Sequence, residues 1–221
     1  MADASYDLTI VMPVYNEQDA IEGVVREWME ELRRLQIRVE FRLYNDGSRD
    51  QTAERLENLR KTYPDLVAVN KPNEGHGPTI LRGYREAAAP WIFQTDSDGE
   101  MPASAFAALW NQRNDYDALF GIRAGREQNL GRKLISFVSR RTVAILFGKG
   151  VVDVNTPYRL IRASLLKPIV AQIPQDTFAP NVIISGALAR AKARILNQPV
   201  PHQGRKSGTV SIVWLYCVRP S

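Results

Sequence analysis

The stretch "LTIVMPVYNEQDAIEGVVREWMEELRRL", residues 8–35, decides the class of fold. Residues 8–15 form an almost continuous apolar run, which is typical of a strand buried on both faces of a sheet. In residues 17–35 the apolar residues recur instead at the spacing of one helix face. This change of period predicts the first strand–helix unit of an α/β fold.

The same alternation continues along the chain. Strands that alternate with helices of ten or more residues imply crossover connections, which build a mainly parallel, twisted sheet with helices on both faces. The sequence therefore predicts a Rossmann-like α/β fold, and no repeat or flexible linker divides residues 1–221 into separate domains. Further strands are predicted at 39–45, 66–70, 91–95 and 117–122, and further helices at 51–63, 78–88, 103–113 and 184–193.

The composition of the 221-residue chain limits the classes of protein to which it can belong. It is 44% hydrophobic and 24% charged, which suits a globular protein with a sizeable core. A single cysteine excludes an internal disulfide, and one cysteine with two histidines excludes the usual His/Cys zinc site. No signal peptide is evident and no apolar run approaches the ~20 residues of a membrane span, so we expect a cytoplasmic protein.

Three acids follow the predicted strand 91–95 at alternate positions, namely Asp96, Asp98 and Glu100. Two carboxylates about 4 Å apart repel each other by roughly 1 kcal/mol in water and by about 4 kcal/mol in a partly closed site. A polar turn that caps the next helix explains one or two of these acids. A divalent cation, Mg²⁺ or Mn²⁺, explains all three, because it takes carboxylate ligands and leaves positions for phosphate oxygens. We therefore favour a metal site.

Polar residues also follow the first two predicted strands. Ligands of parallel α/β sheets bind outside the carboxyl ends of the strands, where all three polar clusters lie. Asp46 could accept hydrogen bonds from a base or ribose, although Asp-Gly-Ser is also ordinary turn chemistry. The glycines of residues 73–83 lack the spacing of a P-loop or a dinucleotide fingerprint, which disfavours a kinase or a dehydrogenase. The residues in the first two loops are Tyr15, Asn16, Glu17, Asn45 and Asp46.

The net charge of +5 favours anionic partners, namely nucleic acid, phosphorylated small molecules or an acidic membrane surface. Nucleic acid is not expected, because the basic residues are scattered and no recognised binding motif is present. Most of the basic residues could simply form a solvated face. Arg123, however, follows the predicted strand 117–122 and should share the rim with the acids. Guanidinium groups beside an acidic metal site are suited to a pyrophosphate leaving group.

Five motifs together resemble a known family. "IVMPVYNEQDAI", "YNDGSRDQT", "NEGHGPTILRGYREA", "TDSDGEMP" and "DVNTPYRL" stand in the order and spacing of family 2 glycosyltransferases with the GT-A fold. Within that family the chain is most similar to the dolichol-phosphate (polyprenyl-phosphate) mannosyltransferase branch, from about Leu8 to about Ile212. The resemblance implies a nucleotide-sugar-binding half, about 7–123, and an acceptor-side half, about 124–221.

The resemblance also implies roles for individual residues. Asp96 and Asp98 would be the D-x-D pair at the diphosphate and cation, with Glu100 near the metal. Asp153 and Arg159 match the acid and the arginine of a "D-x-x-S-G-F-R"-like motif beside the reacting centre. The implied catalytic set is Asp98, Asp153, Arg123 and Arg159. The implied substrate-binding set is Pro13, Tyr15, Asn16, Glu17, Asn45, Asp46, Asp96, Ser97, Arg132 and Arg205, and the metal ligands are Asp96, Asp98 and Glu100.

The expected reaction is therefore inverting, metal-dependent transfer of a sugar from GDP-mannose or a UDP-sugar to a polyprenyl or dolichyl phosphate. One alternative is a hydroxyl acceptor, for which Asp153 would be the base. Another is a nucleotide-sugar-binding protein without catalysis. A lipid acceptor would bring the protein to the cytoplasmic face of a membrane. The amphipathic segment 133–148 could lie on that membrane, although a core-facing helix is the simpler interpretation.

Overall fold

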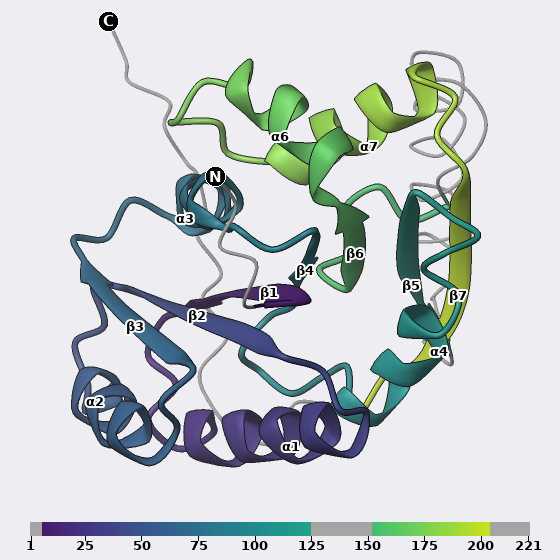
Figure 1. Ribbon diagram of the computed structural model, residues 1–221. Helices are drawn as coiled ribbons and strands as arrows, with labels where there is room; N and C mark the ends of the chain where they lie inside the picture. The colour runs from purple at the N-terminus through teal and green to yellow at the C-terminus, as the bar shows by residue number, and fades with distance from the viewer. Residues whose placement is uncertain (1–5, 125–151, 204–221) are drawn as a thin grey trace, which may run out of the picture.

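The computed structural model describes residues 6–124 and 152–203, which form a sheet with helices on both sides (Figure 1). The expected helix 133–148, Arg132 and Arg205 lie outside the described residues. The strands are β1 (Leu8–Val14), β2 (Val39–Asp46), β3 (Leu66–Lys71), β4 (Trp91–Gln94), β5 (Ala118–Ala124), β6 (Arg159–Arg162) and β7 (Ile195–Pro201). The helices are α1 (Ile21–Arg34), α2 (Thr52–Thr62), α3 (His76–Glu86), the 3-10 turn η1 (Ala103–Ala105), α4 (Phe106–Trp110), α6 (Ala163–Ala171) and α7 (Pro180–Arg190).

The seven strands follow the order β3-β2-β1-β4-β6-β5-β7. Four of the neighbouring pairs are parallel, which confirms the predicted mainly parallel sheet. The exception is β6, which runs antiparallel to both β4 and β5. Neither β6, which has four residues, nor β7 was predicted from the sequence.

The two faces of the sheet have separate cores, as the alternation of side chains along a strand requires. Leu8, Ile10 and Met12 of β1 pack into the core under α1, α2 and α4. Val11 points to the other face, where it joins the core under α3, α6 and α7. A Cβ at Gly83 would lie 2.2 Å from Val11 Cγ1, so glycine is what lets α3 approach β1. Helices on both faces are therefore confirmed (Figure 1).

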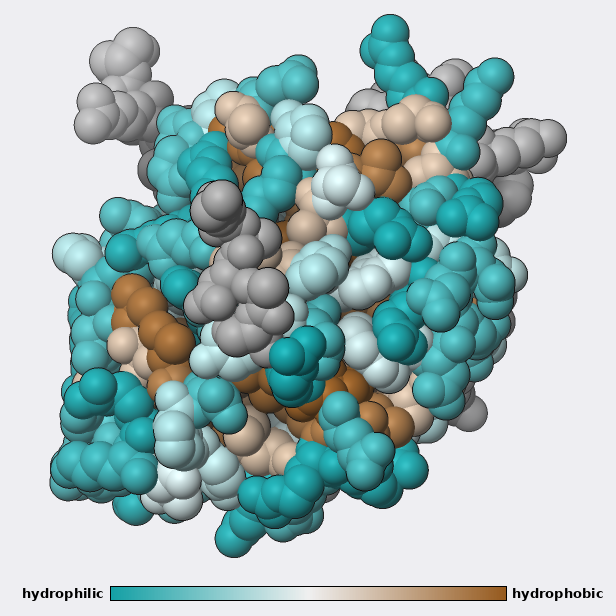
Figure 2. Space-filling model, viewed as in Figure 1, coloured by the Kyte–Doolittle hydropathy of each residue, from teal (hydrophilic) through white to brown (hydrophobic). Residues whose placement is uncertain are grey.

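Several predicted helix boundaries shift in the structure. The helix expected at 78–88 spans His76–Glu86, and the one expected at 184–193 spans Pro180–Arg190, with proline in its first turn. The helix expected at 103–113 begins as the 3-10 turn η1 and continues as α4, which ends at Trp110 because the backbone beyond it forms tighter turns. Polar side chains cover most of the face in Figure 2, with apolar ones in the recesses between them. Within residues 6–124 and 152–203, no helix is long and apolar enough to cross a membrane.

Candidate functional site at the carboxyl edge of the sheet

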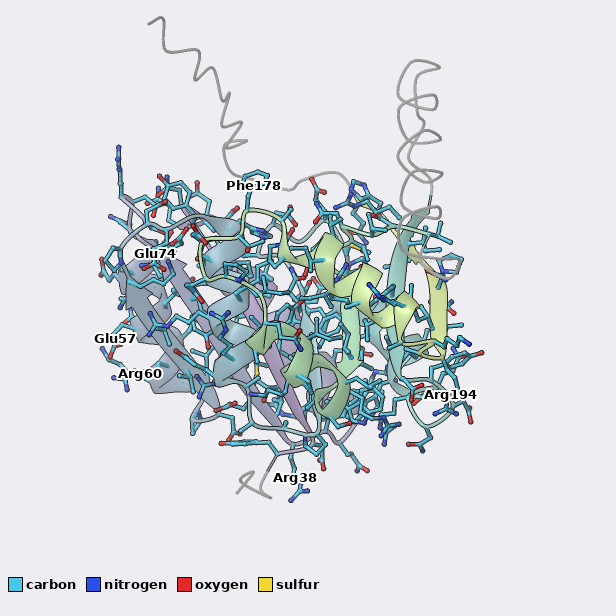
Figure 3. All side chains as sticks on the ribbon, turned by 90° about the horizontal axis from the view of Figure 1, so that it is seen from above. Arg38, Glu57, Arg60, Glu74, Phe178 and Arg194 are labelled. Atoms are coloured by element: carbon cyan, nitrogen blue, oxygen red, sulfur yellow. The ribbon has the colours of Figure 1, made fainter. Side chains whose placement is uncertain are left out.

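The predicted clusters meet at one edge of the sheet. β1, β2 and β4 are parallel, and β5 points the same way because β6 is antiparallel to both β4 and β5. We call the edge at their carboxyl ends the carboxyl edge. Seen from above in Figure 3, Phe178 and Glu74 lie towards this edge, and Arg38, which precedes β2, lies at the opposite one. The sequence-based expectation that the polar clusters converge is confirmed.

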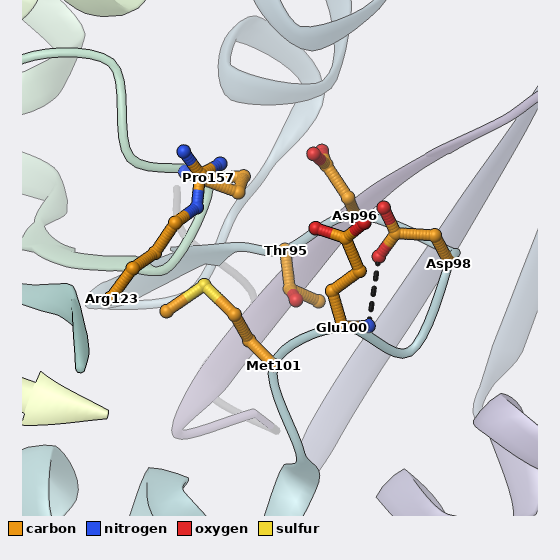
Figure 4. Close-up of a pocket in the computed structure, with 7 residues that line it drawn as sticks. All are labelled: Thr95, Asp96, Asp98, Glu100, Met101, Arg123 and Pro157. Atoms are coloured by element: carbon orange, nitrogen blue, oxygen red, sulfur yellow. Dashed lines mark hydrogen bonds between the residues drawn. The ribbon is translucent and has the colours of Figure 1, made fainter. Parts of the chain in front are cut away.

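A pocket opens at the carboxyl edge between the ends of β4 and β5. Figure 4 shows the carboxylates of three acids gathered on one side, with the guanidinium of Arg123 facing them from the other. The Arg123 Nε atom is buried and has no hydrogen-bond partner among the residues that the structure describes. A buried guanidinium N–H without a partner fits an anion such as a phosphate. The pocket is lined by Thr95, Asp96, Asp98, Glu100, Met101, Arg123 and Pro157.

Asp96 is held on one side of its carboxylate. Its Oδ1 accepts a hydrogen bond from Gln94 Nε2 at 3.2 Å and lies 3.1 Å from His76 Nε2. Partial removal from water lowers the pKa of His76, but the charges of Asp96, Asp46 and Asp98 outweigh this and raise it above its ordinary value. Within residues 6–124 and 152–203, no group is hydrogen-bonded to Asp96 Oδ2, which is therefore available to a ligand.

Asp98 and Glu100 belong to a tight turn. Asp98 Oδ1 accepts a hydrogen bond from the Glu100 backbone N–H at 3.0 Å, and Gly99 between them has a φ of +69°. The Glu100 carboxylate lies 2.9 Å from His202 Nε2, just after β7. Sequence reasoning missed both histidines as site residues. His76 follows a glycine in a quoted motif, but no local pattern connects His202 with an acid 102 positions away.

The expected metal site is only partly assembled. No group of three or more His, Cys, Asp and Glu side chains is arranged to hold a metal ion among the described residues. Glu100 lines the pocket and its Oε2 lies 2.9 Å from His202 Nε2, and its role as a third ligand beside Asp96 and Asp98 stays a prediction. Two carboxylates still fit Mg²⁺ or Mn²⁺, which keep several positions for water and phosphate oxygens. The residues present therefore fit a divalent cation through Asp96 and Asp98.

The loop after β2 is held together by the protein itself. Asp46 is 5% exposed, forms an ion pair with Lys71, and accepts backbone hydrogen bonds from Glu74 and Gly75, both at 2.9 Å. Asn45 donates to Asn70 Oδ1 at 2.8 Å and accepts from the Ser48 backbone at 3.1 Å. Its side chain thus has two partners within the protein, and the expected substrate contact of Asn45 stays a prediction.

The loop after β1 is tied to its neighbour in the same way. Asn16, with a φ of +53°, accepts from the Arg49 backbone at 2.9 Å, and its own N–H donates to Ser48 Oγ at 2.9 Å. Asn16 therefore joins two loops, and its expected substrate contact stays a prediction. Pro13 is buried within β1, and its expected substrate contact also stays a prediction. Tyr15 is half-buried, and Glu17 is 5% exposed.

Arg159 does not reach the pocket. Its side chain is 0% exposed and donates to the backbone carbonyls of Thr156 at 2.9 Å, Val154 at 3.0 Å and Asn181 at 3.2 Å. Burial lowers the pKa of its guanidinium. These contacts give Arg159 a structural role in the loop before β6, and its expected catalytic role stays a prediction.

Two other expected residues lie close to the pocket without lining it. Asp153 is half-buried and accepts a hydrogen bond from the Asn155 backbone at 3.2 Å, in the loop that carries Pro157. Ser97 stands between the two aspartates but is only 6% exposed. Neither is among the residues that line the pocket.

The fold is shared with glycosyltransferases of known structure. A mannosyltransferase from Pyrobaculum calidifontis, solved with GDP-Man and Mn²⁺, is 19% identical, with a TM-score of 0.68 over 93% of this chain and 59% of that chain. Glucosyl-3-phosphoglycerate synthase from Mycobacterium tuberculosis, solved with Mn²⁺ and UDP-Glc, is 18% identical, with a TM-score of 0.62 over 95% of this chain and 74% of that chain. The class of fold is therefore GT-A, as predicted.

Sequence comparison defines the family. The model for glycosyl transferase family 2 matches residues 9–169, so the chain belongs to this family. Similar curated proteins include the undecaprenyl-phosphate 4-deoxy-4-formamido-L-arabinose transferases of Pectobacterium atrosepticum (27% identical, 95% of this chain, 63% of the relative) and Pseudomonas fluorescens SBW25 (28%, 91% and 58%). The chain thus spans about three fifths of the length of these relatives.

Proposed function

We propose that the protein is an inverting, metal-dependent glycosyltransferase that moves a sugar from GDP-mannose or a UDP-sugar to a polyprenyl phosphate. The observation that carries this proposal is the pocket in which Asp96 and Asp98 face Arg123. Family membership and the undecaprenyl-phosphate named for the curated relatives support it. The nucleotide sugars named for two similar structures agree with it.

The donor diphosphate would lie between the acids and Arg123. Asp96 and Asp98 would hold Mg²⁺ or Mn²⁺, which supplies positive charge against the leaving diphosphate. Arg123 brings a permanent positive charge and a buried, unpartnered N–H to the opposite side. The base and ribose would bind over the loops after β1 and β2, where Tyr15, Glu17 and Asp46 remain the predicted contacts. The hydrogen bonds of these loops keep that surface in place before the donor binds.

The undecaprenyl-phosphate named for the curated relatives supports a phosphate rather than a hydroxyl as the acceptor group. A hydroxyl needs a base close to the reacting centre, and Asp153 does not line the pocket. A phosphate monoester is already largely ionised at pH 7, since its second pKa is about 6, and it can attack without a strong base. Arg132 and Arg205 remain the expected contacts of this phosphate. A polyprenyl acceptor would place residues 124–221, the expected acceptor-side half, at a membrane surface with the protein bound peripherally.

A transfer assay tests the proposal. The protein is incubated with Mn²⁺, a panel of labelled UDP-sugars and GDP-mannose, and undecaprenyl phosphate in detergent micelles. We expect label in the lipid fraction, and none when EDTA removes the cation. Parallel reactions with a glycan acceptor and with no acceptor separate the alternatives. Transfer only to the glycan would contradict the phosphate acceptor, and donor binding without transfer or hydrolysis would contradict catalysis.

A further inference from the structure

A buried polar network lies beneath the pocket and runs from Asp96 to helix α7. Gln94, the last residue of β4, and Tyr84 of α3 are both 0% exposed, and Asn181 in the first turn of α7 is 2% exposed. Gln94 Nε2 donates to Asp96 Oδ1 at 3.2 Å, and Asn181 Nδ2 donates to Gln94 Oε1 at 2.9 Å. Burying an amide without a hydrogen-bond partner lowers the stability of a protein. In this network each buried amide has partners, which indicates a specific role.

The chemistry of these groups fixes the direction of the network. An ionised carboxylate only accepts hydrogen bonds, so the NH₂ end of the Gln94 amide must face Asp96. Its carbonyl end then faces Asn181, which supplies an N–H. The Tyr84 hydroxyl lies 3.3 Å from Gln94 Oε1 and 3.2 Å from Asn181 Oδ1, and completes the junction without contacting Asp96. Gln94 is therefore locked by its partners in the orientation that donates to the acid.

Helix α7 also braces the loop that carries Pro157 of the pocket wall. Arg159 Nη1 donates to the Asn181 carbonyl at 3.2 Å, and Ser185 Oγ donates to the Val154 carbonyl at 2.9 Å. The same helix thus contacts the Asp96 side of the pocket through Gln94 and the Pro157 side through residues 154–159. Packed, fully hydrogen-bonded supports of this kind hold ligand side chains to the geometry that a metal requires.

We propose that Gln94 and Asn181 are positioning residues for the cation site. By holding Asp96 Oδ1 from below, they keep Oδ2 directed to the divalent cation and so set the affinity for that ion. His76 contacts the same Oδ1, but its side chain is 55% exposed and water can replace it, whereas nothing replaces the buried Gln94 amide. The inference rests on the proposed function, because it requires a cation at Asp96.

The experiment measures Mn²⁺ binding directly, by calorimetry and by the electron paramagnetic resonance signal of free Mn²⁺, with saturating UDP and, separately, GDP. Gln94→Met keeps the side-chain volume and removes the amide, and Asn181→Ala removes the second member of the network. Tyr84→Phe is the matched control, because it deletes a hydroxyl from the same junction but keeps both the Asn181 bond to Gln94 and the Gln94 bond to Asp96. Near-UV circular dichroism and thermal unfolding show whether each variant is folded.

We expect Gln94→Met to weaken Mn²⁺ binding by about tenfold or more, because residues that orient metal ligands typically contribute 10–100-fold to affinity. Asn181→Ala should give a smaller loss, and Tyr84→Phe should stay close to wild type. Nucleotide affinity without metal should be unchanged in all three. Because Asn181 acts through Gln94, the double variant should bind Mn²⁺ no more weakly than Gln94→Met alone.

The outcomes separate this inference from the proposed function. A wild-type protein that takes up no Mn²⁺ with either nucleotide would overturn the proposed function and this inference together. A wild-type protein that binds Mn²⁺, with a folded Gln94→Met variant of equal affinity, would overturn the positioning role alone. Additive losses in the double variant would exclude action of Asn181 through Gln94. If Gln94→Met is not folded, equal Mn²⁺ affinities of Asn181→Ala and Tyr84→Phe would overturn the inference.

Discussion

Two polar clusters at the carboxyl edge have similar sequences, but their side chains have different surroundings. In the β2 cluster, which we define as Asn45, Asp46 and Asp50, the side chains bond to Lys71 and to backbone N–H groups of the surrounding loops. In the β4 cluster, defined as Asp96, Asp98 and Glu100, the acids line a pocket opposite Arg123. The comparison teaches that acids after two parallel strands can differ in their surroundings: Asp46 is buried against Lys71, whereas Asp96, Asp98 and Glu100 line a pocket.

The largest expected effect tests the β4 cluster. If the proposed function is right, Asp98→Asn should lower sugar transfer by about 10²–10³-fold, because it would remove one of the two negative charges proposed to hold the cation against the leaving diphosphate. The amide oxygen of the substituted side chain can still accept the hydrogen bond from the Glu100 backbone N–H, so the temperature of thermal unfolding should be unchanged. Asp19→Asn, at an exposed position after β1, is the matched control and should keep full activity. An Asp98→Asn enzyme with wild-type turnover would contradict the assignment.

The next effect tests the β2 cluster through stability. Asp46→Ala removes the buried ion-pair partner of Lys71, whose side chain is 1% exposed, and leaves it only the half-exposed carboxylate of Glu74 at 3.2 Å. Breaking a buried pair in this way costs about 3–5 kcal/mol of unfolding free energy, measured by urea titration. Adding Lys71→Met to Asp46→Ala should recover part of the loss, because no charge is then left buried. If Asp46→Ala is as stable as wild type, the β2 cluster is not neutralised by the protein as described.

A smaller effect is expected at Asn45. Asn45→Ala leaves Asn70 and the Ser48 N–H without their buried partner, and should lower the unfolding free energy by about 1–2 kcal/mol. Asn58→Ala, on the exposed face of α2, provides the comparison and should change stability little. A loss of nucleotide binding with no loss of stability would instead restore Asn45 to the substrate contacts.

The smallest effect is the pH dependence at Asp50. Partial burial raises the pKa of Asp50, but hydrogen bonds from Thr52 and Gln18 outweigh it, so that the pKa is lowered. A lowered folded-state pKa contributes stability above the unfolded value, about 3.9 for Asp, and that contribution is lost as the pH falls through the folded-state value. Urea unfolding between about pH 5 and pH 3 should therefore be less pH-dependent in Asp50→Asn. If the unfolding free energies of the wild type and of Asp50→Asn change equally with pH in this range, the prediction is wrong.

The sequence predicted the parts of the fold and site that depend on local pattern. The apolar run of β1 and the helical spacing of α1 identified the α/β class, and the position of Asp96 and Asp98 after a strand located the pocket. The five ordered motifs identified the family that the model for residues 9–169 then confirmed. These signals need no knowledge of which distant residues meet.

The parts that the sequence did not predict depend on such meetings. Lys71 is 25 positions from Asp46, and no period or motif connects the two. Arg159 was expected at the reacting centre, but β6 inserts between β4 and β5 and buries it among backbone carbonyls. Gln94 and Asn181 are 87 positions apart and carry no motif. The environment of each of these residues depends on its hydrogen-bond and ion-pair partners, and only the tertiary structure shows which residues meet.

The most direct test of the central claim is anomalous scattering from crystals soaked with Mn²⁺ and the nucleotide that stabilises the protein. The account predicts one manganese peak between the Asp96 and Asp98 carboxylates, with the diphosphate extending towards Arg123. A peak at Asp46, or a diphosphate bound in the pocket without any metal at Asp96 and Asp98, would contradict it.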